Sequence, residues 1–231
     1  LESINKRYTR VAKVAKTKDK DAVAELAVLD KIKPVLEEGK SARTIEFTEE
    51  EQKIVKSLFL LTTKPILYVA NVSEDDVADA DANHYVQEVR NFAAEENAEV
   101  IVVSARAEEE IAELDEEDKA EFLEALGIEE SGLDQLIRAA YDLLGLATYF
   151  TAGEQEVRAW TFKKGIKAPQ AAGIIHSDFE RGFIRAETVS FEDLDHYGNM
   201  HAAKEAGRVR LEGKDYVDDE TFNQKEFIDH V

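Results

Sequence analysis

Residues that could bind a small molecule follow two short apolar runs of the sequence. They are Asn71, Val72 and Glu74 after residues 66–70, and Ser104 and Ala105 after residues 100–103. The first run lacks helical spacing and the second is rich in β-branched residues, which predicts two buried parallel strands. Ligands of an open parallel sheet bind beyond the carboxyl ends of its strands. We therefore expect these five residues to form one binding site.

The residue types in the two loops suit the edge of a purine base. Asn71 can both donate and accept hydrogen bonds, and the Ser104-Ala105 turn can present backbone N–H groups. Guanine-specific GTPases place Asn-Lys-x-Asp after one strand and Ser-Ala after a later one. In this sequence Glu74 replaces the Asp and Val72 replaces the Lys. Guanine offers two donors to one carboxylate, whereas adenine offers one donor beside a bare acceptor. Glu74 is longer than the Asp that it replaces and should bind the two guanine donors poorly. Adenine is therefore the better candidate.

A second interpretation of the first loop is structural. Ser73 is followed by three acidic residues, which is a common way to begin a helix because the acids interact favourably with its dipole. On this interpretation the loop only caps a helix, and the chain is a non-enzymatic module that binds RNA or protein. The loops alone leave both interpretations open.

No other set of residues predicts a catalytic or metal site. The five histidines lack metal-ligand spacing: His84, His176, His196, His201 and His230. No nucleophile accompanies His176 and Asp178, so a turn or surface role is expected there. Four aromatic residues could stack on RNA, but alternating aromatics in a small β domain usually form its core. They are Trp160, Phe162, Phe179 and Phe183.

Charge is distributed unevenly along the 231 residues, whose formal net charge is −21. Residues 1–33 contain nine Lys or Arg and five Asp or Glu, whereas residues 106–134 contain two basic and thirteen acidic residues. The first segment could contact phosphate groups and the second could not. No apolar run is long enough to span a bilayer and there is no cysteine, so we expect a cytoplasmic protein without membrane contact. The chain begins at Leu1 and its only methionine is Met200. We therefore interpret the sequence as a fragment of a longer protein.

Helical spacing dominates the first part of the chain. Residues 1–38 are expected to form an antiparallel helical hairpin, with Ile4, Tyr8, Val11 and Ala15 on one stripe and a bend or break at Pro34. Thr48 and Glu51 form a capping-box pattern that begins another helix, with Ile54, Val55, Leu58 and Phe59 on it.

The rest of the chain predicts a parallel sheet followed by a small mixed domain. A helix over residues 82–96 would connect the two strands, and an amphipathic helix over residues 133–144 would end at Gly145. Beyond it, strands are expected over residues 148–151, 157–162 and 183–189, with a short helix over residues 168–176.

Several segments resemble signatures of the YchF-type, or Obg-like, ATPases. They are Tyr149-Phe150-Thr151-Ala152-Gly153, Glu156-Val157-Arg158-Ala159-Trp160-Thr161, residues 172–187 from Ala-Gly-Ile-Ile-His-Ser-Asp-Phe onward, and residues 204–216. Residues 64–71 and 111–114 look similar too, so the resemblance extends to about Val217.

The resemblance implies an α/β plus α+β protein of the P-loop GTPase superfamily. It implies a helical coiled-coil arm over residues 1–62, part of a GTPase-like domain over 63–146, and a TGS domain of ubiquitin-like β-grasp form over 147–231. It also implies ATP preferred over GTP, Mg²⁺ in the complete protein, and a link to translation or stress response. Asn71 and Glu74 match the altered base-recognition motif, Val72 the apolar residue beside adenine, and Ser104 and Ala105 the last nucleotide loop.

Two departures from the family qualify these expectations. The sequence contains no Gly-x-x-x-x-Gly-Lys-Ser/Thr segment, so we expect this chain by itself not to hydrolyse ATP and to bind nucleotide weakly or not at all. The tail after Val217 does not match the apolar strand that usually closes the TGS sheet, which puts its closure in doubt. The expected partners are the ribosome, its RNA or its proteins, bound by a monomer through the arm and the TGS domain.

Overall fold

The computed structural model describes residues 1–152, 156–217 and 226–229. The chain divides into two compact units, Leu1–Ala139 and Ala140–Val231. No helix of the described residues is long and apolar enough to cross a membrane.

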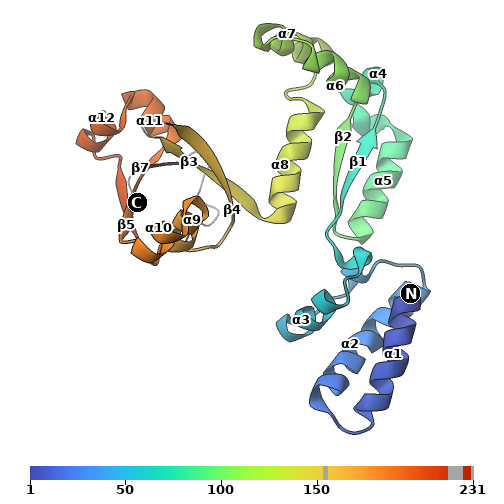
Figure 1. Cartoon of the computed structure of the whole chain (residues 1–231). Helices are drawn as coiled ribbons and strands as arrows, with labels where there is room; N and C mark the ends of the chain where they lie inside the picture. The colour runs from blue at the N-terminus through green and yellow to red at the C-terminus, as the bar shows by residue number, and fades with distance from the viewer. Residues whose placement is uncertain (153–155, 218–225, 230–231) are drawn as a thin grey trace. The chain divides into compact units, whose positions relative to one another are not determined.

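The first unit is mostly helical and contains one two-stranded sheet (Figure 1). Its elements are α1 (Glu2–Ala15), α2 (Lys20–Glu37), η1 (Ala42–Thr44), α3 (Glu49–Ser57), η2 (Leu61–Thr63), β1 (Leu67–Asn71), α4 (Glu74–Val77), η3 (Ala80–Ala82), α5 (His84–Glu95), β2 (Glu99–Val103), α6 (Ala105–Ala112) and α7 (Glu116–Leu126). Helix α8 (Gly132–Leu144) begins in this unit and ends, as expected, before Gly145.

The predicted helical hairpin is confirmed by α1 and α2, drawn in blue in Figure 1. Ile4 and Val11 of α1 are buried against Ala22 and Leu29 of α2. These residues share one face of each helix, because side chains three, four and seven positions apart align along an α-helix. The hairpin is therefore held together by its own apolar seam.

The sequence predicts a bend or a break at Pro34. A break does not occur, because helix α2 continues to Glu37. The fully buried Val28 and Ile32 lie just before the proline and pack in one cluster with Ala42 and Val55. This packing holds the last turns of α2 in place although Pro34 lacks an N–H group to donate.

The capping box at the start of α3 is confirmed. The Thr48 hydroxyl accepts a hydrogen bond from the Glu51 N–H, and the Glu51 carboxylate accepts one from the Thr48 N–H. The placement of Phe59 on this helix is wrong, because α3 ends at Ser57 and Phe59 has a φ of 51°. This left-handed backbone ends the helical stripe and leaves the Phe59 side chain 91% exposed.

The two predicted parallel strands are confirmed as β1 and β2. Their register runs from Leu67 opposite Glu99 to Asn71 opposite Val103. Helix α5 connects them, and it begins at His84 because the Asn83 side chain accepts a hydrogen bond from the Tyr85 N–H.

The second unit is built on a five-stranded sheet in the order β4-β3-β7-β5-β6. Its elements are β3 (Leu146–Ala152), β4 (Val157–Lys163), α9 (Ala168–Ile175), α10 (Ser177–Gly182), β5 (Arg185–Ser190), α11 (Phe191–Tyr197), α12 (Met200–Glu205), β6 (Arg210–Gly213) and β7 (Glu226–Asp229). The predicted strands over 148–151 and 157–162 and the helix over 168–176 are confirmed. Phe183 was expected in a strand, but it precedes β5 and is buried against Ala172 and Ala186.

The sequence puts closure of this sheet by the tail in doubt, but the tail does contribute a strand, β7. Strand β7 pairs in parallel with β3 and antiparallel with β5, and it joins these two strands. Pairing uses backbone N–H and C=O groups, which every residue except proline carries, so a sequence without the usual apolar pattern can still occupy this position. The other residues after Val217 lie outside the described part of the chain.

Most of the aromatic residues considered for stacking are in the core. Phe162 and Phe183 are each 2% exposed, and Trp160 packs at the edge of a cluster with Tyr149. Phe179 is the exception, with 40% of its surface exposed.

The hairpin seam predicts the effect of a truncation in α2. Leu29 is fully buried, so Leu29→Ala should destabilise the hairpin by about 2–5 kcal/mol. Val23→Ala on the same helix is the control, because Val23 is 49% exposed. The measurement is the opening free energy from hydrogen exchange of the α1 and α2 amides. Equal effects of the two substitutions would contradict the assigned packing.

Candidate functional site

The carboxyl ends of β1 and β2 lie side by side. Asn71, the last residue of β1, is paired with Val103, the last residue of β2. The pairing continues one residue further, because the Val72 N–H donates to the Val103 carbonyl at 2.8 Å. The structure therefore brings the two predicted loops together at one edge of the sheet.

The Asn71 side chain connects the two loops directly. Its Oδ1 atom accepts a hydrogen bond from the Ala105 N–H at 2.9 Å. The sequence predicts that the Ser104-Ala105 turn presents its N–H groups to a ligand, but here the Ala105 N–H binds Asn71. The Asn71 amide Nδ2 has no hydrogen-bond partner among the residues that the structure describes. Asn71 is itself exposed, so this donor is accessible to a ligand.

Ser104 has a structural position at the start of α6. Its side chain is buried, and its hydroxyl accepts a hydrogen bond from the Ala107 N–H at 3.4 Å. The hydroxyl therefore caps α6 and fixes the direction in which the turn leaves β2.

Glu74 carries a buried acceptor close to this edge. Its side chain is 27% exposed, and its Oε1 atom is buried without a hydrogen bond to any described residue. The nearest cation is Arg106, whose Nε atom lies 3.5 Å from Oε1, an ion-pair distance without hydrogen-bond geometry. A buried acceptor without a hydrogen bond is costly, so this oxygen favours a ligand that donates to it.

The sequence interpretation omitted Arg106 from the site. Arg106 follows Ala105 in the first turn of α6, is 75% exposed, and also lies 3.5 Å from Glu110. Counting one residue beyond the Ser104-Ala105 pair would have found it. Its position beside Glu74 requires the two loops to come together, which the linear sequence does not show.

The alternative interpretation of the first loop also has structural support. Helix α4 does begin at Glu74, directly after Ser73. The Ser73 hydroxyl donates to the Asp76 carboxylate at 2.8 Å, but no side-chain bond caps the backbone of α4. Asn71 also acts as a cap, since it binds the first N–H of α6.

A cavity of about 260 Å³ in the first unit does not include any of the five predicted residues. Its lining carries three acids, Asp79, Asp81 and Glu130, and the cation Arg90 is paired with Asp81 at 2.9 Å. An acidic lining repels phosphate, so we do not assign this cavity to a nucleotide. Among the described residues, no group of three or more His, Asp or Glu side chains is arranged to hold a metal ion.

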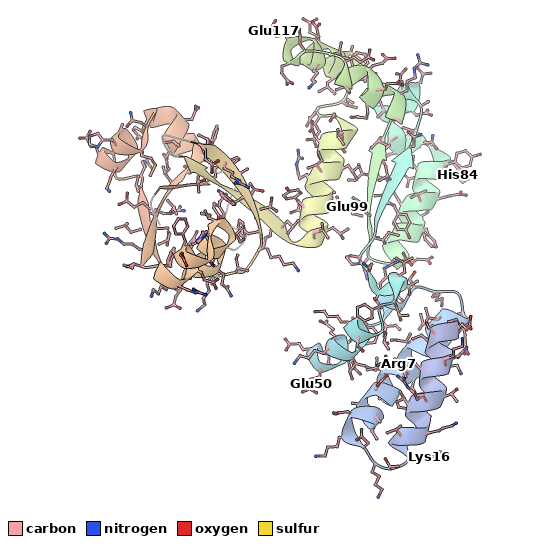
Figure 2. The ribbon with its side chains drawn as sticks, in the orientation of Figure 1. Arg7, Lys16, Glu50, His84, Glu99 and Glu117 are labelled. Carbon is pink, nitrogen blue, oxygen red and sulfur yellow. The ribbon has the colours of Figure 1, made fainter. Side chains whose placement is uncertain are left out.

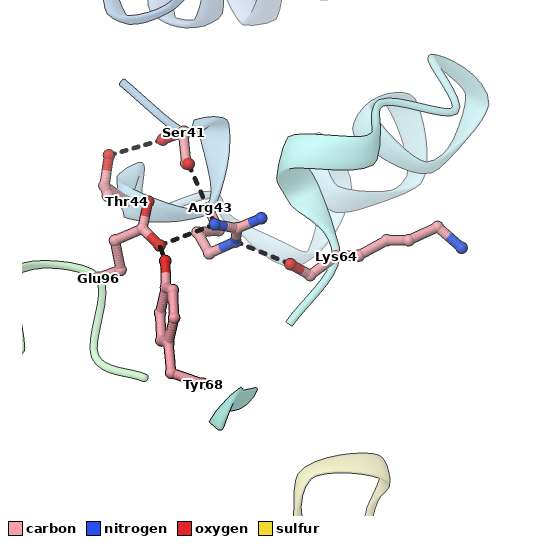
Figure 3. Close-up of polar contacts among 6 residues, drawn as sticks. All are labelled: Ser41, Arg43, Thr44, Lys64, Tyr68 and Glu96. Atoms are coloured by element: carbon pink, nitrogen blue, oxygen red, sulfur yellow. Dashed lines mark hydrogen bonds and ion pairs between the residues drawn. The ribbon is translucent and has the colours of Figure 1, made fainter. Parts of the chain in front are cut away.

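A polar cluster at the amino-terminal side of β1 joins this strand to the helical segment before it, residues 1–64 (Figure 3). Arg43 donates to the Glu96 carboxylate and to the Lys64 carbonyl, both at 2.8 Å, and Tyr68 donates to Glu96 at 2.7 Å. The Arg43 and Glu96 side chains are only 14% and 8% exposed. Since Tyr68 lies in β1, three residues before Asn71, this cluster fixes the strand that carries the site.

The cluster also changes the acidity of its members. The Ser41 hydroxyl, then Tyr68 and Arg43, hold the pKa of Glu96 below its usual value against the opposing effect of burial. The hydrogen bond to Glu96 raises the pKa of Tyr68. The cluster therefore favours an ionised Glu96 and a protonated Tyr68.

Comparison with known proteins gives a consistent match over nearly the whole chain. The chain is 70% identical over 217 residues to the ribosome-binding ATPase YchF of Bacillus subtilis, and 52% identical to that of Escherichia coli O157:H7. Each alignment covers 94% of this chain and 59% of the relative. This chain is homologous to the YchF proteins. The predicted resemblance is confirmed.

Two further comparisons support this homology. The family model YchF-GTPase_C, described as "Protein of unknown function (DUF933)", matches residues 146–221. The structure of the Schizosaccharomyces pombe YchF GTPase covers 99% of this chain and 61% of its own, with a TM-score of 0.81 and 33% identity. The mixed helix and sheet fold therefore matches that of the Schizosaccharomyces pombe protein. This chain spans about 59% of the length of its curated relatives.

The polar cluster predicts a pH dependence for this YchF homologue. Because the folded pKa of Glu96 is depressed, its contribution to stability is present above the unfolded value of about 4.3. It is lost as pH falls through the lower folded pKa. Hydrogen exchange of the β1 amides, corrected for intrinsic rates, should show easier opening in acid for the wild type.

The Glu96→Gln variant should open more easily at neutral pH and show a flatter pH dependence, since it cannot ionise. Glu95→Gln is the matched control, because Glu95 is exposed and adjacent. If Glu96→Gln has the pH profile of the wild type, Glu96 does not carry the effect.

Proposed function

We propose that this chain provides the base-recognition part of a purine-nucleotide site in a ribosome-associated ATPase. The observation that carries the proposal is the Asn71 side chain, which joins the loops after β1 and β2 and keeps an accessible amide donor. In parallel sheets such loops are where ligands bind. Homology to proteins named ribosome-binding ATPase YchF supports the same assignment.

Adenine is the proposed base. An asparagine side chain can pair with adenine by donating to N7 and accepting from the N6 amino group. In this structure the Asn71 oxygen is occupied by Ala105, which leaves its donor for N7. The buried Glu74 Oε1 atom supplies an acceptor that the N6 amino group can satisfy. Val72, in place of a lysine, provides an apolar surface beside the ring.

The phosphates and Mg²⁺ are assigned to residues outside this sequence. The chain has no Gly-x-x-x-x-Gly-Lys-Ser/Thr segment, whose backbone N–H groups would cradle phosphates. We infer that ATP hydrolysis depends on the part of the relatives' length that this chain does not span. By itself the chain should bind ATP or GTP weakly.

The remaining parts are proposed as partner-binding elements. The hairpin and α3 within residues 1–62 correspond to a coiled-coil arm, and residues 63–146 to the nucleotide-binding part. Residues 147–231, with the five-stranded sheet and α9 packed on it, correspond to a TGS domain of β-grasp form. The arm and this domain would bind the ribosome, and the protein would act as a cytoplasmic monomer.

The test separates the two roles of Asn71. Asn71→Asp keeps an oxygen that accepts from the Ala105 N–H but removes the amide donor. In a chimera that joins this chain to the unmatched part of the Bacillus subtilis relative, calorimetry should show ATP binding weakened about 10- to 100-fold. Asn91→Asp, an exposed change of equal charge on α5, should leave ATP binding unaltered.

The rival function is an interaction module in which the Asn71 loop only caps α6. Its supporting observation is the same hydrogen bond to Ala105, which serves a cap equally well. If Asn71→Asp and Glu74→Ala both bind ATP as tightly as the unaltered chimera, this rival is favoured and the nucleotide role is wrong.

A further inference from the structure

The loop end of the α1–α2 hairpin concentrates positive charge in an otherwise acidic chain. Residues 5–20 contain seven Lys or Arg and one acid, Asp19, while the whole chain has a net charge of −21. Figure 2 shows Lys16 where α1 turns into α2. We define the hairpin tip by Arg10, Lys13, Lys16, Lys18 and Lys20, all of which are exposed.

The hairpin seam places the α1 cations on the outer face. Ile4 and Val11 point to the seam. At about 100° per residue, Lys13 lies on the opposite side of α1 and Arg10 lies on its outer flank. Lys6 shares that outer face, and its ammonium group is paired with Glu2 at 2.6 Å. Ile4 and Val11 therefore pack inside the hairpin, whereas Val14 is 45% exposed and the α1 cations face solvent.

The five tip cations have no ion-pair partner among the described residues. The one acid of the segment is already engaged, since Asp19 caps α2 by accepting from the Ala22 N–H at 2.8 Å. Closer to the base of the hairpin the pattern changes: Arg7 binds Glu25, and Lys33 lies over the Tyr8 ring. The tip is thus the part of the hairpin where positive charge is left uncompensated.

The chemistry of the tip favours phosphate over other partners. Protein interfaces are depleted in lysine and enriched in aromatic residues, but residues 9–20 contain no aromatic side chain. A helix that lies on a membrane presents an apolar face to lipid, whereas that face of α1 is covered by α2. Arginine and lysine are the residues that contact nucleic-acid backbones.

We propose that the hairpin tip binds the phosphate backbone of RNA without sequence preference. The inference rests on the proposed ribosome association and specifies its contact: Arg10 and Lys13 along α1, and Lys16, Lys18 and Lys20 around the turn. Such binding releases counterions and weakens steeply with salt. The net negative charge of the remainder of the chain repels RNA and restricts the contact to the tip.

The test compares two double variants, each of which removes two positive charges from one helix of the first unit. Arg10→Gln/Lys13→Gln removes two exposed cations three residues apart on α1, and Lys53→Gln/Lys56→Gln does the same on α3. Glutamine has nearly the helix propensity of lysine and arginine, so both variants should melt like the wild type. Binding of the whole chain to a fluorescent single-stranded RNA of mixed sequence is measured by anisotropy over a range of salt.

The tip variant should lower the slope of log affinity against log salt by about 1.4, since each phosphate contact contributes about 0.7 on a single strand. At about 0.1 M salt this is an affinity loss on the order of 25-fold. The α3 variant should match the wild type. Equal losses in both variants, or no RNA binding by the wild type, would overturn the proposal.

Two further measurements separate the partner classes and the proposed function. Tighter binding to poly-glutamate than to RNA would contradict the proposal and indicate an acidic protein partner. Tighter binding to anionic phospholipid vesicles would contradict it and indicate a membrane. Ribosome co-sedimentation of the same variants is read separately. If the wild type and the tip variant co-sediment equally, the tip assignment is wrong and ribosome association is supported. If RNA binding depends on the tip but neither protein co-sediments with ribosomes, the tip assignment is supported and the proposed ribosome association is wrong.

Discussion

The parallel pairing of β1 and β2 is the constraint on which the candidate site depends. Its register places Asn71 opposite Val103, so both chains leave the sheet at the same edge. A shift of one residue would turn Asn71 to the other face of the sheet and separate it from Ala105. With this register, one side chain can connect two loops that are 34 residues apart. The site is thus a consequence of strand pairing, and the loop residues add the chemistry.

Strand β1 is fixed at both ends by polar contacts. Near its start, Tyr68 donates to Glu96, which also binds Arg43 from the helical segment. At its end, Asn71 binds the first turn of α6. A movement of the helical segment that pulled on Arg43 would therefore act on the strand that carries Asn71. This arrangement gives a physical connection between the hairpin, for which we propose partner binding, and the proposed nucleotide site.

Features that depend on neighbouring residues could be predicted from the sequence, and features that depend on distant pairs could not. The stripe of Ile4 and Val11, the capping box of Thr48 and Glu51, and the end of α8 before Gly145 follow from local spacing. The Arg43–Glu96 pair joins residues 53 positions apart, and no local pattern indicates it. The five candidate residues could be chosen from their types and their places after two apolar runs, but the bond that occupies the Ala105 N–H requires the register of the sheet. The position of β7 between β3 and β5 was missed because backbone pairing leaves little trace in side-chain pattern.

The connection between the two loops is tested most directly by hydrogen exchange at the Ala105 amide, followed by nuclear magnetic resonance in this chain. We expect protection in the wild type, loss of protection in Asn71→Ala, and unchanged protection of the Val72 amide, which donates to Val103 within the ladder. A hydrogen bond worth about 1 kcal/mol corresponds to roughly a fivefold change in exchange rate. An Ala105 amide that exchanges at the same rate in both proteins would show that Asn71 does not connect the two loops.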